Sequence, residues 1–287
     1  AGPDAPVTAQ VAIGELEDDS ARLPENRTLR FSINGQPYGQ VVLDQEAALD
    51  PTQVDRLLAA LLEDSRIEFN SDDHVWRLSD RGSGAILLKM DDFQGRVGTE
   101  TALYKKGDQP SSAVLNPVDP PIVRLPALPK PTRSDIRRFE QSSDQIVKAI
   151  QAQAEDSRYC PLLDEEDAQG SDRPLALHRL SDTKLLASIG CWYAAYNFGD
   201  GYWVVNDQPP YAPVLVTDSG TDHQGGVIIS AQKGRGLGDC WSMEDWTWDG
   251  NQFVHTQSLS TGMCKLMAAG GTWVLPTLVS EVIKPTK

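Results

Sequence analysis

The stretch that decides the fold runs from Gly238-Asp239-Cys240-Trp241 to Trp246-Thr247-Trp248-Asp249-Gly250. It sets one cysteine and three tryptophans between two glycine turns. Six of the seven tryptophans and all four cysteines fall between residues 160 and 273. An even set of cysteines in a segment rich in aromatic residues and glycines is typical of a small β domain stapled by disulfides. We therefore expect the second half of the chain to be such a domain.

Four cysteines, Cys160, Cys191, Cys240 and Cys264, allow three pairings, and the sequence leaves the choice open. Our choice is Cys240 with Cys264 and Cys160 with Cys191. The turn-like flanks of Cys240 and Cys264 favour bridges over free buried thiols, which are the alternative. Zinc is disfavoured because no Cys-x-x-Cys pair exists and the four histidines are scattered. Disulfides indicate an oxidising compartment, so we expect a protein outside the cytosol.

The second half reads as short strands separated by turns such as Asp200-Gly201 and Asp249-Gly250. The even spacing predicts an antiparallel meander or sandwich-like sheet. The expected strands are 175–180, 184–189, 192–196, 203–206, 214–217, 227–231, 245–248, 253–257 and 273–278.

The first half has the pattern of an α+β domain with a small antiparallel sheet and about two helices. Residues 27–43 alternate around the hairpin turn Asn34-Gly35. Asp50 is the expected cap of one helix, and Ser79 or Asp80 that of a second. Short strands are expected at 66–69 and 75–78. Gly95 should end the second helix, and 101–105 is expected to be a last strand.

Seven prolines lie between Pro110 and Pro131, where no amphipathic period is present. This composition predicts an extended linker. We therefore expect an N-terminal domain at 1–108, a linker at 109–133 and a C-terminal part at 134–287. That last part should open with short helices, or one bent helix, beginning at Ser134. The fold class expected for the whole chain is α+β with a mainly β C-terminal domain.

The bulk composition excludes some partners. The chain of 287 residues has a net charge of −15, which disfavours nucleic acid and an anionic membrane leaflet. No apolar run approaches the roughly 20 residues of a membrane helix. The chain starts at Ala1 without Met or an apolar signal segment, so we expect that a signal was removed or the chain trimmed.

Two pairs of segments resemble a known family. The first pair is 78–82, Leu-Ser-Asp-Arg-Gly, with 89–99, which runs from Lys89 to Thr99. The second is 233–240, ending in Gly238-Asp239-Cys240, with 246–253. Together they resemble the bacterial family called domain of unknown function 1176. The first half also faintly resembles the invasion-associated locus B family.

The main resemblance implies an exported protein of a Gram-negative bacterium, periplasmic or secreted, with a cleaved signal. It also implies a preceding stretch with one tryptophan and two cysteines that is missing here. It supplies no activity and no catalytic residues.

Five residues are candidates for ligand binding. Lys233 and Arg235 flank alternate glycines in the loop 233–239, whose backbone amides could cradle an anion; the alternative is a turn leading into a disulfide. Tyr202, Trp203 and Trp241 could form an exposed platform for sugar rings; the alternative is a packed core. Tyr202 and Trp203 are expected to be the most exposed of these aromatics.

The remaining candidates carry weaker signals. Asp164, Glu165 and Asp167 have the oxygen density of a calcium site but miss the EF-hand spacing, so a solvated acidic loop is the preferred interpretation. His178, His223 and His255 are isolated from any nucleophile motif. Asp91 and Asp92 are adjacent on a helix and do not face one another. We therefore predict no catalytic residue, no metal and no cofactor.

Three functions stay open. The first is a non-catalytic binding or interaction protein of the bacterial envelope, with an envelope protein or a glycan as partner. The second is an envelope hydrolase with an unfamiliar site, which needs a cleft where a histidine meets carboxylates. The third is a protein inhibitor that presents the loop 233–239 rigidly.

Overall fold

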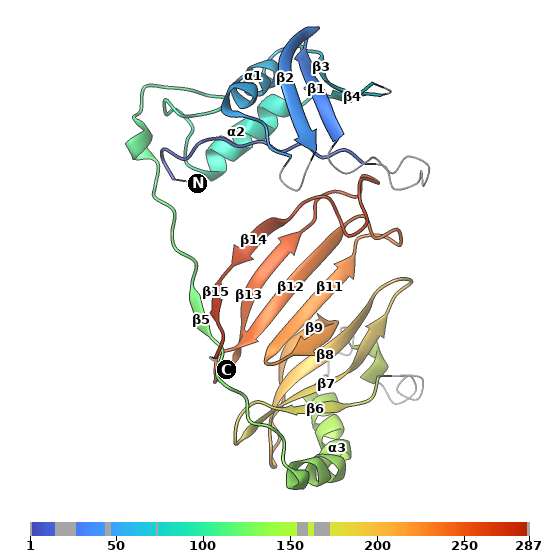
Figure 1. Cartoon of the computed structure of the whole chain (residues 1–287). Coiled ribbons are helices and arrows are strands. Elements are labelled where there is room, and N and C mark those ends of the chain that lie inside the picture. The colour runs from blue at the N-terminus through green and yellow to red at the C-terminus, as the bar shows by residue number, and fades with distance from the viewer. Residues whose placement is uncertain are drawn as a thin grey trace. The chain divides into compact units, whose positions relative to one another are not determined.

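The computed structural model describes residues 2–14, 27–43, 47–72, 74–153, 160–163 and 173–285. The chain separates into two compact units, Ala1–Asp119 and Pro120–Lys287 (Figure 1). The described residues form three α-helices and many antiparallel strands, most of them in the second unit. The expected α+β class with a β-rich second half is confirmed. None of the described helices is long and apolar enough to cross a membrane.

The first unit contains a four-stranded antiparallel sheet. Its spatial order is β2-β1-β3-β4, formed by β1 (Arg27–Ile33), β2 (Gln36–Leu43), β3 (Ile67–Asn70) and β4 (Val75–Leu78). Asn34 and Gly35, with φ of 50° and 82°, form the predicted hairpin turn between β1 and β2. Both residues need positive φ in such a turn, which Asn and Gly adopt at little cost.

Helix α1 (Pro51–Leu61) covers this sheet. Asp50 accepts from the Gln53 backbone N–H at 2.9 Å, and the Gln53 side chain accepts from the Asp50 N–H at 3.0 Å, so a capping box starts the helix. Val54 and Leu57 face the sheet and join a core with Leu29 and Phe31. The predicted cap at Asp50 is confirmed.

Helix α2 (Ser83–Phe93) differs from prediction at its start. Its N-cap is Gly82, with φ of 81°, rather than Ser79 or Asp80. The Asp80 carboxylate instead accepts from the Ser65 N–H at 2.8 Å, because the fold brings the end of α1 beside it. The helix ends as predicted, since Gly95 adopts φ of 68°.

The strand predicted at 101–105 is wrong. Asp91 on α2 is completely buried, and its carboxylate accepts from the backbone N–H groups of Leu103 and Tyr104 at 2.8–2.9 Å. These amides are therefore engaged by a side chain instead of a strand partner, and the segment is a loop. A 3₁₀ turn, η2 (Ser111–Ala113), follows.

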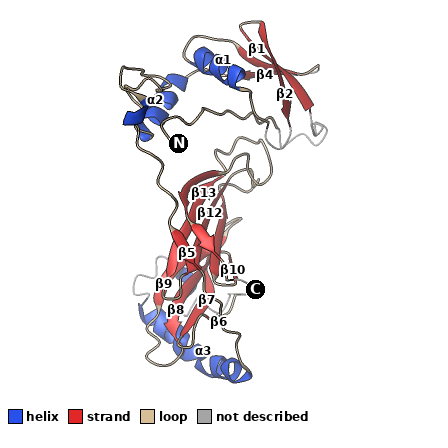
Figure 2. Ribbon diagram, turned by 60° about the vertical axis from the view of Figure 1, so that its left-hand side comes forward, coloured by secondary structure: helices blue, strands red, loops and turns tan. Residues whose placement is uncertain are grey.

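The second unit has three layers: a helix, a first sheet and a second sheet (Figures 1 and 2). The helix is α3 (Arg133–Gln153), one continuous helix where short helices or a bent one were expected. The first sheet, β6-β7-β8-β9, consists of β6 (Ala176–Arg179), β7 (Lys184–Tyr193), β8 (Phe198–Asn206) and β9 (Val214–Gly220). The second sheet, β10-β11-β12-β13-β14, consists of β10 (Asp222–Gln224), β11 (Val227–Lys233), β12 (Trp241–Trp248), β13 (Phe253–Ser260) and β14 (Leu275–Val279).

Each face of the first sheet is buried by a different layer. Successive residues of a strand point to opposite faces. On β8, Trp203 and Val205 therefore pack with Phe139 and Ile146 of α3. Tyr202 and Val204 pack toward the second sheet, in the cluster that contains Ile228 and the fully buried Trp248. Burial on both faces explains why β7 and β8 are almost continuously apolar.

Part of the expected linker belongs to the second unit. Strand β5 (Ile122–Arg124) pairs in parallel with β15 (Glu281–Ile283), and Val123 and Leu125 are buried. Each strand is only three residues long. The boundary between the units, at Asp119 and Pro120, falls inside the proline-rich segment.

One of the two turns predicted in the second half is present, and one is not. Asp249-Gly250 forms the turn between β12 and β13, with Gly250 at φ of 102°. Asp200-Gly201 is not a turn, because both residues lie inside β8. The strand expected at 245–248 starts earlier, at Trp241, because its partner β11 extends to Lys233.

Both disulfides lie in the second unit and have the pairing we chose from the sequence. Cys160 is joined to Cys191, with 4.4 Å between their Cα atoms, and Cys240 to Cys264, with 4.9 Å. The first connects the segment after α3, which includes the 3₁₀ turn η4 (Pro161–Leu163), to β7. The second ties the start of β12 to the loop after β13.

Candidate functional site

A polar cleft opens between the two sheets of the second unit, where edge strands β6 and β10 approach one another. Its volume is about 410 Å³, within the range of small-molecule sites. At this edge of the sheets, the apolar core ends and polar side chains line the space between them. The lining residues are Arg173, Pro174, Ala176, His178, Ser188, Ile189, Gly190, Asp200, Tyr202, Thr221, Asp222 and His223.

Strand register explains how these residues meet. Ala176, Ser188 and Tyr202 are direct cross-strand neighbours on β6, β7 and β8, so they form one row on the face toward the second sheet. His178 lies two residues beyond Ala176 and shares that face. His223 comes from β10, the edge strand of the second sheet, and completes the opposite wall.

The two histidines face one another across the cleft, with ring centroids 4.8 Å apart. The Gly226 N–H donates to His223 Nε2 at 3.3 Å, so the neutral ring carries its proton on Nδ1. Burial, with a smaller contribution from His178, lowers the pKa of His223 to about 4, although Asp222 acts in the other direction. His223 is therefore neutral at physiological pH.

Two hydroxyl groups in the row are available to a ligand. Among the described residues, neither the Tyr202 hydroxyl nor the Ser188 hydroxyl has a hydrogen-bond partner. Burial raises the pKa of Tyr202 well above its usual value, so the phenol stays protonated and able to donate. Neither oxygen is among the buried, unpartnered side-chain atoms of the described residues, so both hydroxyls are open to solvent and can bind a ligand in the cleft.

A bidentate ion pair forms the end of the cleft. Arg173 donates through Nε and Nη2 to the two carboxylate oxygens of Asp200, at 2.6 and 2.5 Å. The Arg173 guanidinium also lies 4.0 Å from the centroid of the Phe198 ring. Asp200 is buried, and its pairing with Arg173 balances the charge. With Asp222, the lining holds one guanidinium and two carboxylates, so its net charge is slightly negative.

The exposure predicted for Tyr202 and Trp203 is wrong. Their exposed fractions are only 3% and 5%, because α3 covers one face of β8 and the second sheet covers the other. Tyr202 still reaches the cleft, but Trp203 lies in the core against α3. The Tyr202 ring also packs against Gly220, so its face is not a free stacking platform.

The other three ligand candidates form a separate cluster at the loop after β11. Arg235 binds both carboxylate oxygens of Asp239, at 2.7 and 2.6 Å, and Asp239 also accepts from the Leu266 N–H at 2.7 Å. Lys233 lies over the Trp241 ring, 5.4 Å from its centroid. Both cations thus have partners in their own loop. This is the geometry of a braced turn, and anion binding there stays a prediction.

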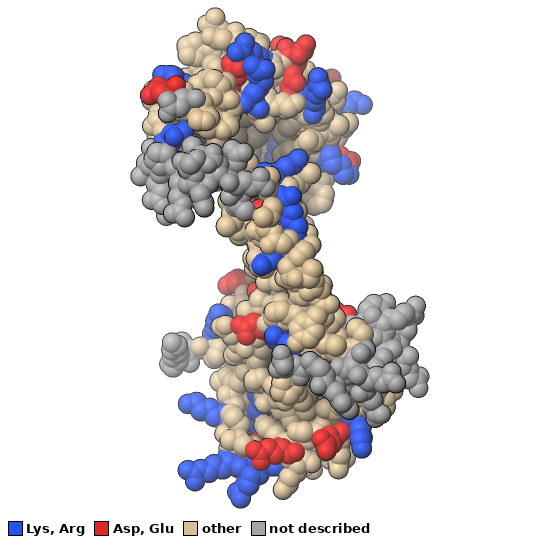
Figure 3. Space-filling view, turned by 90° about the vertical axis from the view of Figure 1, so that its right-hand side faces the viewer, with Lys and Arg blue, Asp and Glu red and all other residues tan. Residues whose placement is uncertain are grey.

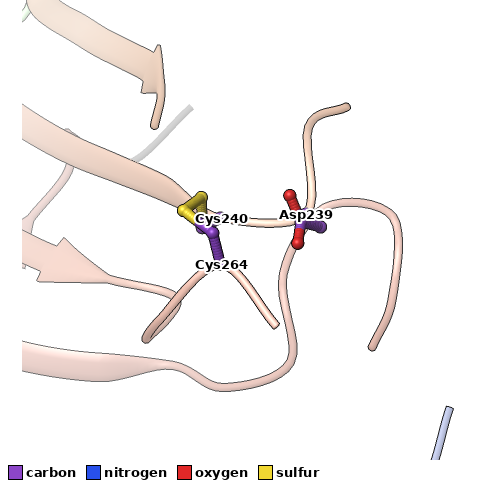
Figure 4. A group of neighbouring side chains, drawn as sticks. All are labelled: Asp239, Cys240 and Cys264. Carbon is purple, nitrogen blue, oxygen red and sulfur yellow. A yellow bond between two sulfur atoms is a disulfide. The ribbon is translucent and has the colours of Figure 1, made fainter. Parts of the chain in front are cut away.

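One group of possible metal ligands occurs among the described residues: Asp239, Cys240 and Cys264 (Figure 4). The two sulfur atoms are joined in a disulfide, so they offer no thiolate. Hydrogen bonding to Arg235, together with that from the Leu266 N–H, holds the pKa of Asp239 far below its usual value. We therefore assign this group a structural role. The calcium candidates Asp164, Glu165 and Asp167 lie outside the described residues.

The remaining sequence candidates have structural surroundings. His255 stacks on Trp246, with centroids 5.0 Å apart. Asp91 holds the loop after α2, and Asp92 pairs with Lys89 at 2.7 Å. None of these three belongs to the cleft.

Sequence reasoning missed Arg173, Ser188 and Asp200, and it weighed His178 and His223 separately. Ser188 carried a signal: it interrupts the apolar run 185–189 of a buried strand. No local pattern joined Arg173 to Asp200, because the pair is 27 residues apart in sequence.

The fold and the cleft define a disulfide-stapled α+β protein with a polar site between two sheets. The chain belongs to the family described as "Protein of unknown function (DUF1176)", whose model matches residues 1–280. It is 27% identical over 252 residues to "Uncharacterized protein YpfG" of Escherichia coli strain K12, covering 80% of this chain and 66% of that protein. The chain thus spans about two thirds of that relative's length.

No solved structure matches the chain. The fainter likeness of the first half to the invasion-associated locus B family is not shown by these comparisons and stays a prediction.

Proposed function

We propose that this protein is a non-catalytic binding protein of the bacterial envelope, and that the cleft between its sheets receives a small glycan. The observation that carries this proposal is the convergence of the unpaired Tyr202 and Ser188 hydroxyls with the Arg173–Asp200 pair on one cleft. Each group is held by a strand or an ion pair, so little ordering entropy is lost when a ligand binds.

A neutral, hydroxyl-rich ligand suits this chemistry best. Sugar hydroxyls both donate and accept hydrogen bonds, and the cleft offers two hydroxyls (Tyr202, Ser188) together with an imidazole acceptor (His178). An anionic ligand is disfavoured because Arg173 is already paired with Asp200, and Asp222 adds a second carboxylate to the lining. Since the Tyr202 ring is packed against Gly220, we expect recognition by hydrogen bonds rather than by stacking on that ring.

Two disulfides support an address outside the cytosol, in the periplasm or beyond. The exported character that the family resemblance implies agrees with this address. The expected partners are therefore glycans of the envelope, or an envelope protein that carries one.

Binding is tested by a glycan array followed by calorimetry of the best ligand. Tyr202→Phe and Ser188→Ala should each weaken binding about fivefold to tenfold, the usual cost of one lost hydrogen bond. Tyr211→Phe is the matched control, because its hydroxyl binds Gln145 and does not line the cleft. An unaltered affinity in both cleft variants, or no glycan bound at all, would count against the proposal.

One observation favours a hydrolase as the second candidate. The cleft brings His178 and His223 together with Asp200 and Asp222, which is the meeting of histidine and carboxylate that such an enzyme needs. Among the described residues, however, no hydrogen bond joins Ser188 to either imidazole, so no activated nucleophile is assembled. Turnover of a bound glycan that is abolished by His223→Asn would establish the enzyme instead.

A further inference from the structure

We propose that the loop platform of the second unit docks the protein on the surface of an anionic lipid bilayer. The loop platform is the end of the unit formed by residues 194–197, 234–240 and 261–274. It shares no lining residue with the polar cleft, so either site can exist without the other.

The three loops are braced into one rigid body. Asn197 exchanges two hydrogen bonds with the backbone of Lys233, both at 2.9 Å, which ties the first loop to the second. The Gly270 N–H donates to the Gly238 carbonyl at 2.9 Å, and the Cys240–Cys264 disulfide adds a covalent link, which together tie the second loop to the third. A platform held in this way loses little entropy on docking.

Large apolar side chains are exposed on all three loops. The exposed fractions are 45% for Tyr196, 50% for Leu237, 74% for Met263 and 74% for Val274. Trp273, also partly exposed, packs beside Gly262. Aliphatic tips with neighbouring Tyr and Trp are the residue types found where proteins enter the headgroup region of a membrane.

The platform is locally basic. Lys233, Arg235 and Lys265 stand against one carboxylate, Asp239. Arg235 is paired with Asp239, so the positive charge that remains is that of the two lysines. The net charge of −15 does not prevent docking, because charges more than about 10 Å from the bilayer are screened at 0.1 M salt. On the face drawn in Figure 3, basic side chains likewise lie among acidic ones. A local cationic site is thus compatible with an acidic chain.

A bilayer is favoured over a protein partner by the distribution of the apolar groups. They are spread over three separate loops. A fluid interface accepts such side chains one by one, whereas a protein partner must provide a complementary pocket for each. The basic neighbours then contribute the attraction that lysine and arginine have for anionic headgroups.

The test is cosedimentation of the full oxidised chain with vesicles of phosphatidylcholine, with and without phosphatidylglycerol. Binding should require phosphatidylglycerol and weaken as salt is raised. Leu237→Gln should lower the partition coefficient about tenfold, and Lys265→Gln about fivefold. The matched controls are Leu215→Gln on β9, where the leucine is also 50% exposed, and Lys148→Gln on the exposed side of α3.

The folding of each variant is checked by its melting temperature and by the mass of the oxidised protein. The proposal is overturned if phosphatidylglycerol does not increase binding, or if the control variants lose as much as the platform variants. Binding of a purified envelope protein that depends on Leu237, without vesicle binding, would also overturn it. That result would favour a protein inhibitor that presents the loop 233–239.

Discussion

Removal of the Cys240–Cys264 disulfide should destabilise the second unit by about 3.5 kcal/mol. The two cysteines are 24 residues apart, and the chain-entropy relation for a loop of that length gives about 3.5 kcal/mol at 25 °C. For a unit the size of Pro120–Lys287 this corresponds to a fall in melting temperature of about 7–14 °C. The variant is Cys240→Ala with Cys264→Ala, which leaves no free thiol at the site.

Urea unfolding followed by tryptophan fluorescence measures the effect, because six of the seven tryptophans report on the second unit. The matched control is Cys160→Ala with Cys191→Ala, whose separation of 31 predicts a nearly equal loss of about 3.7 kcal/mol. A loss below about 1 kcal/mol for the first pair would refute the entropic reasoning. A much larger loss for the control alone would show that packing around the buried Cys191 outweighs loop closure.

Asp91→Asn should destabilise the first unit by about 1–3 kcal/mol, because the amide NH2 replaces one of the two oxygens that accept from the Leu103 N–H. We expect faster hydrogen exchange at the Leu103 amide, and an unchanged exchange rate would contradict the prediction. The pKa of His223 is about 4 in the folded chain and about 6.5 in the unfolded chain. As the pH is lowered from 6.5 to 4, the unfolded chain binds the proton first, so the free energy of unfolding should fall by on the order of 2 kcal/mol. His223→Gln should flatten that part of a pH series of urea midpoints, and an unaltered slope would show that other groups cause it. Gly95→Ala should lower the free energy of unfolding by about 1 kcal/mol. The cause is the backbone φ of 68°, because no atom lies within 4 Å of the added methyl group. Thermal melting measures this, and an unchanged melting temperature would show that the turn relaxes.

Much of the local structure was predictable because its causes lie within a few residues. Asp50 and Gln53 form the capping box from a spacing of three, and Asn34-Gly35 meets the turn's demand for positive φ. The prediction failed at residues 101–105 and at the cap of α2, where Asp91 and Asp80 bind backbone amides from distant segments. Such contacts leave no trace in a local pattern.

For the candidate site, the sequence predicted some of the residues but not that they lie together. Tyr202, His178 and His223 were visible as chemically capable residues, but their meeting depends on which edge of each sheet carries β6 and β10.

By itself, the sequence determined the fold class, the presence of disulfides in the second half, and the turns at Asn34-Gly35 and Asp249-Gly250. The strand expected at 203–206 left Tyr202 out; in the structure both rings lie on β8, Phe198–Asn206, where successive side chains face opposite sides. Only the tertiary structure decided that α3 would cover one side and a second sheet the other, which buried both rings and left a polar cleft at the open edge. The physical reason is that side-chain alternation is a local property of the backbone, whereas burial depends on which layer the chain brings back against each face.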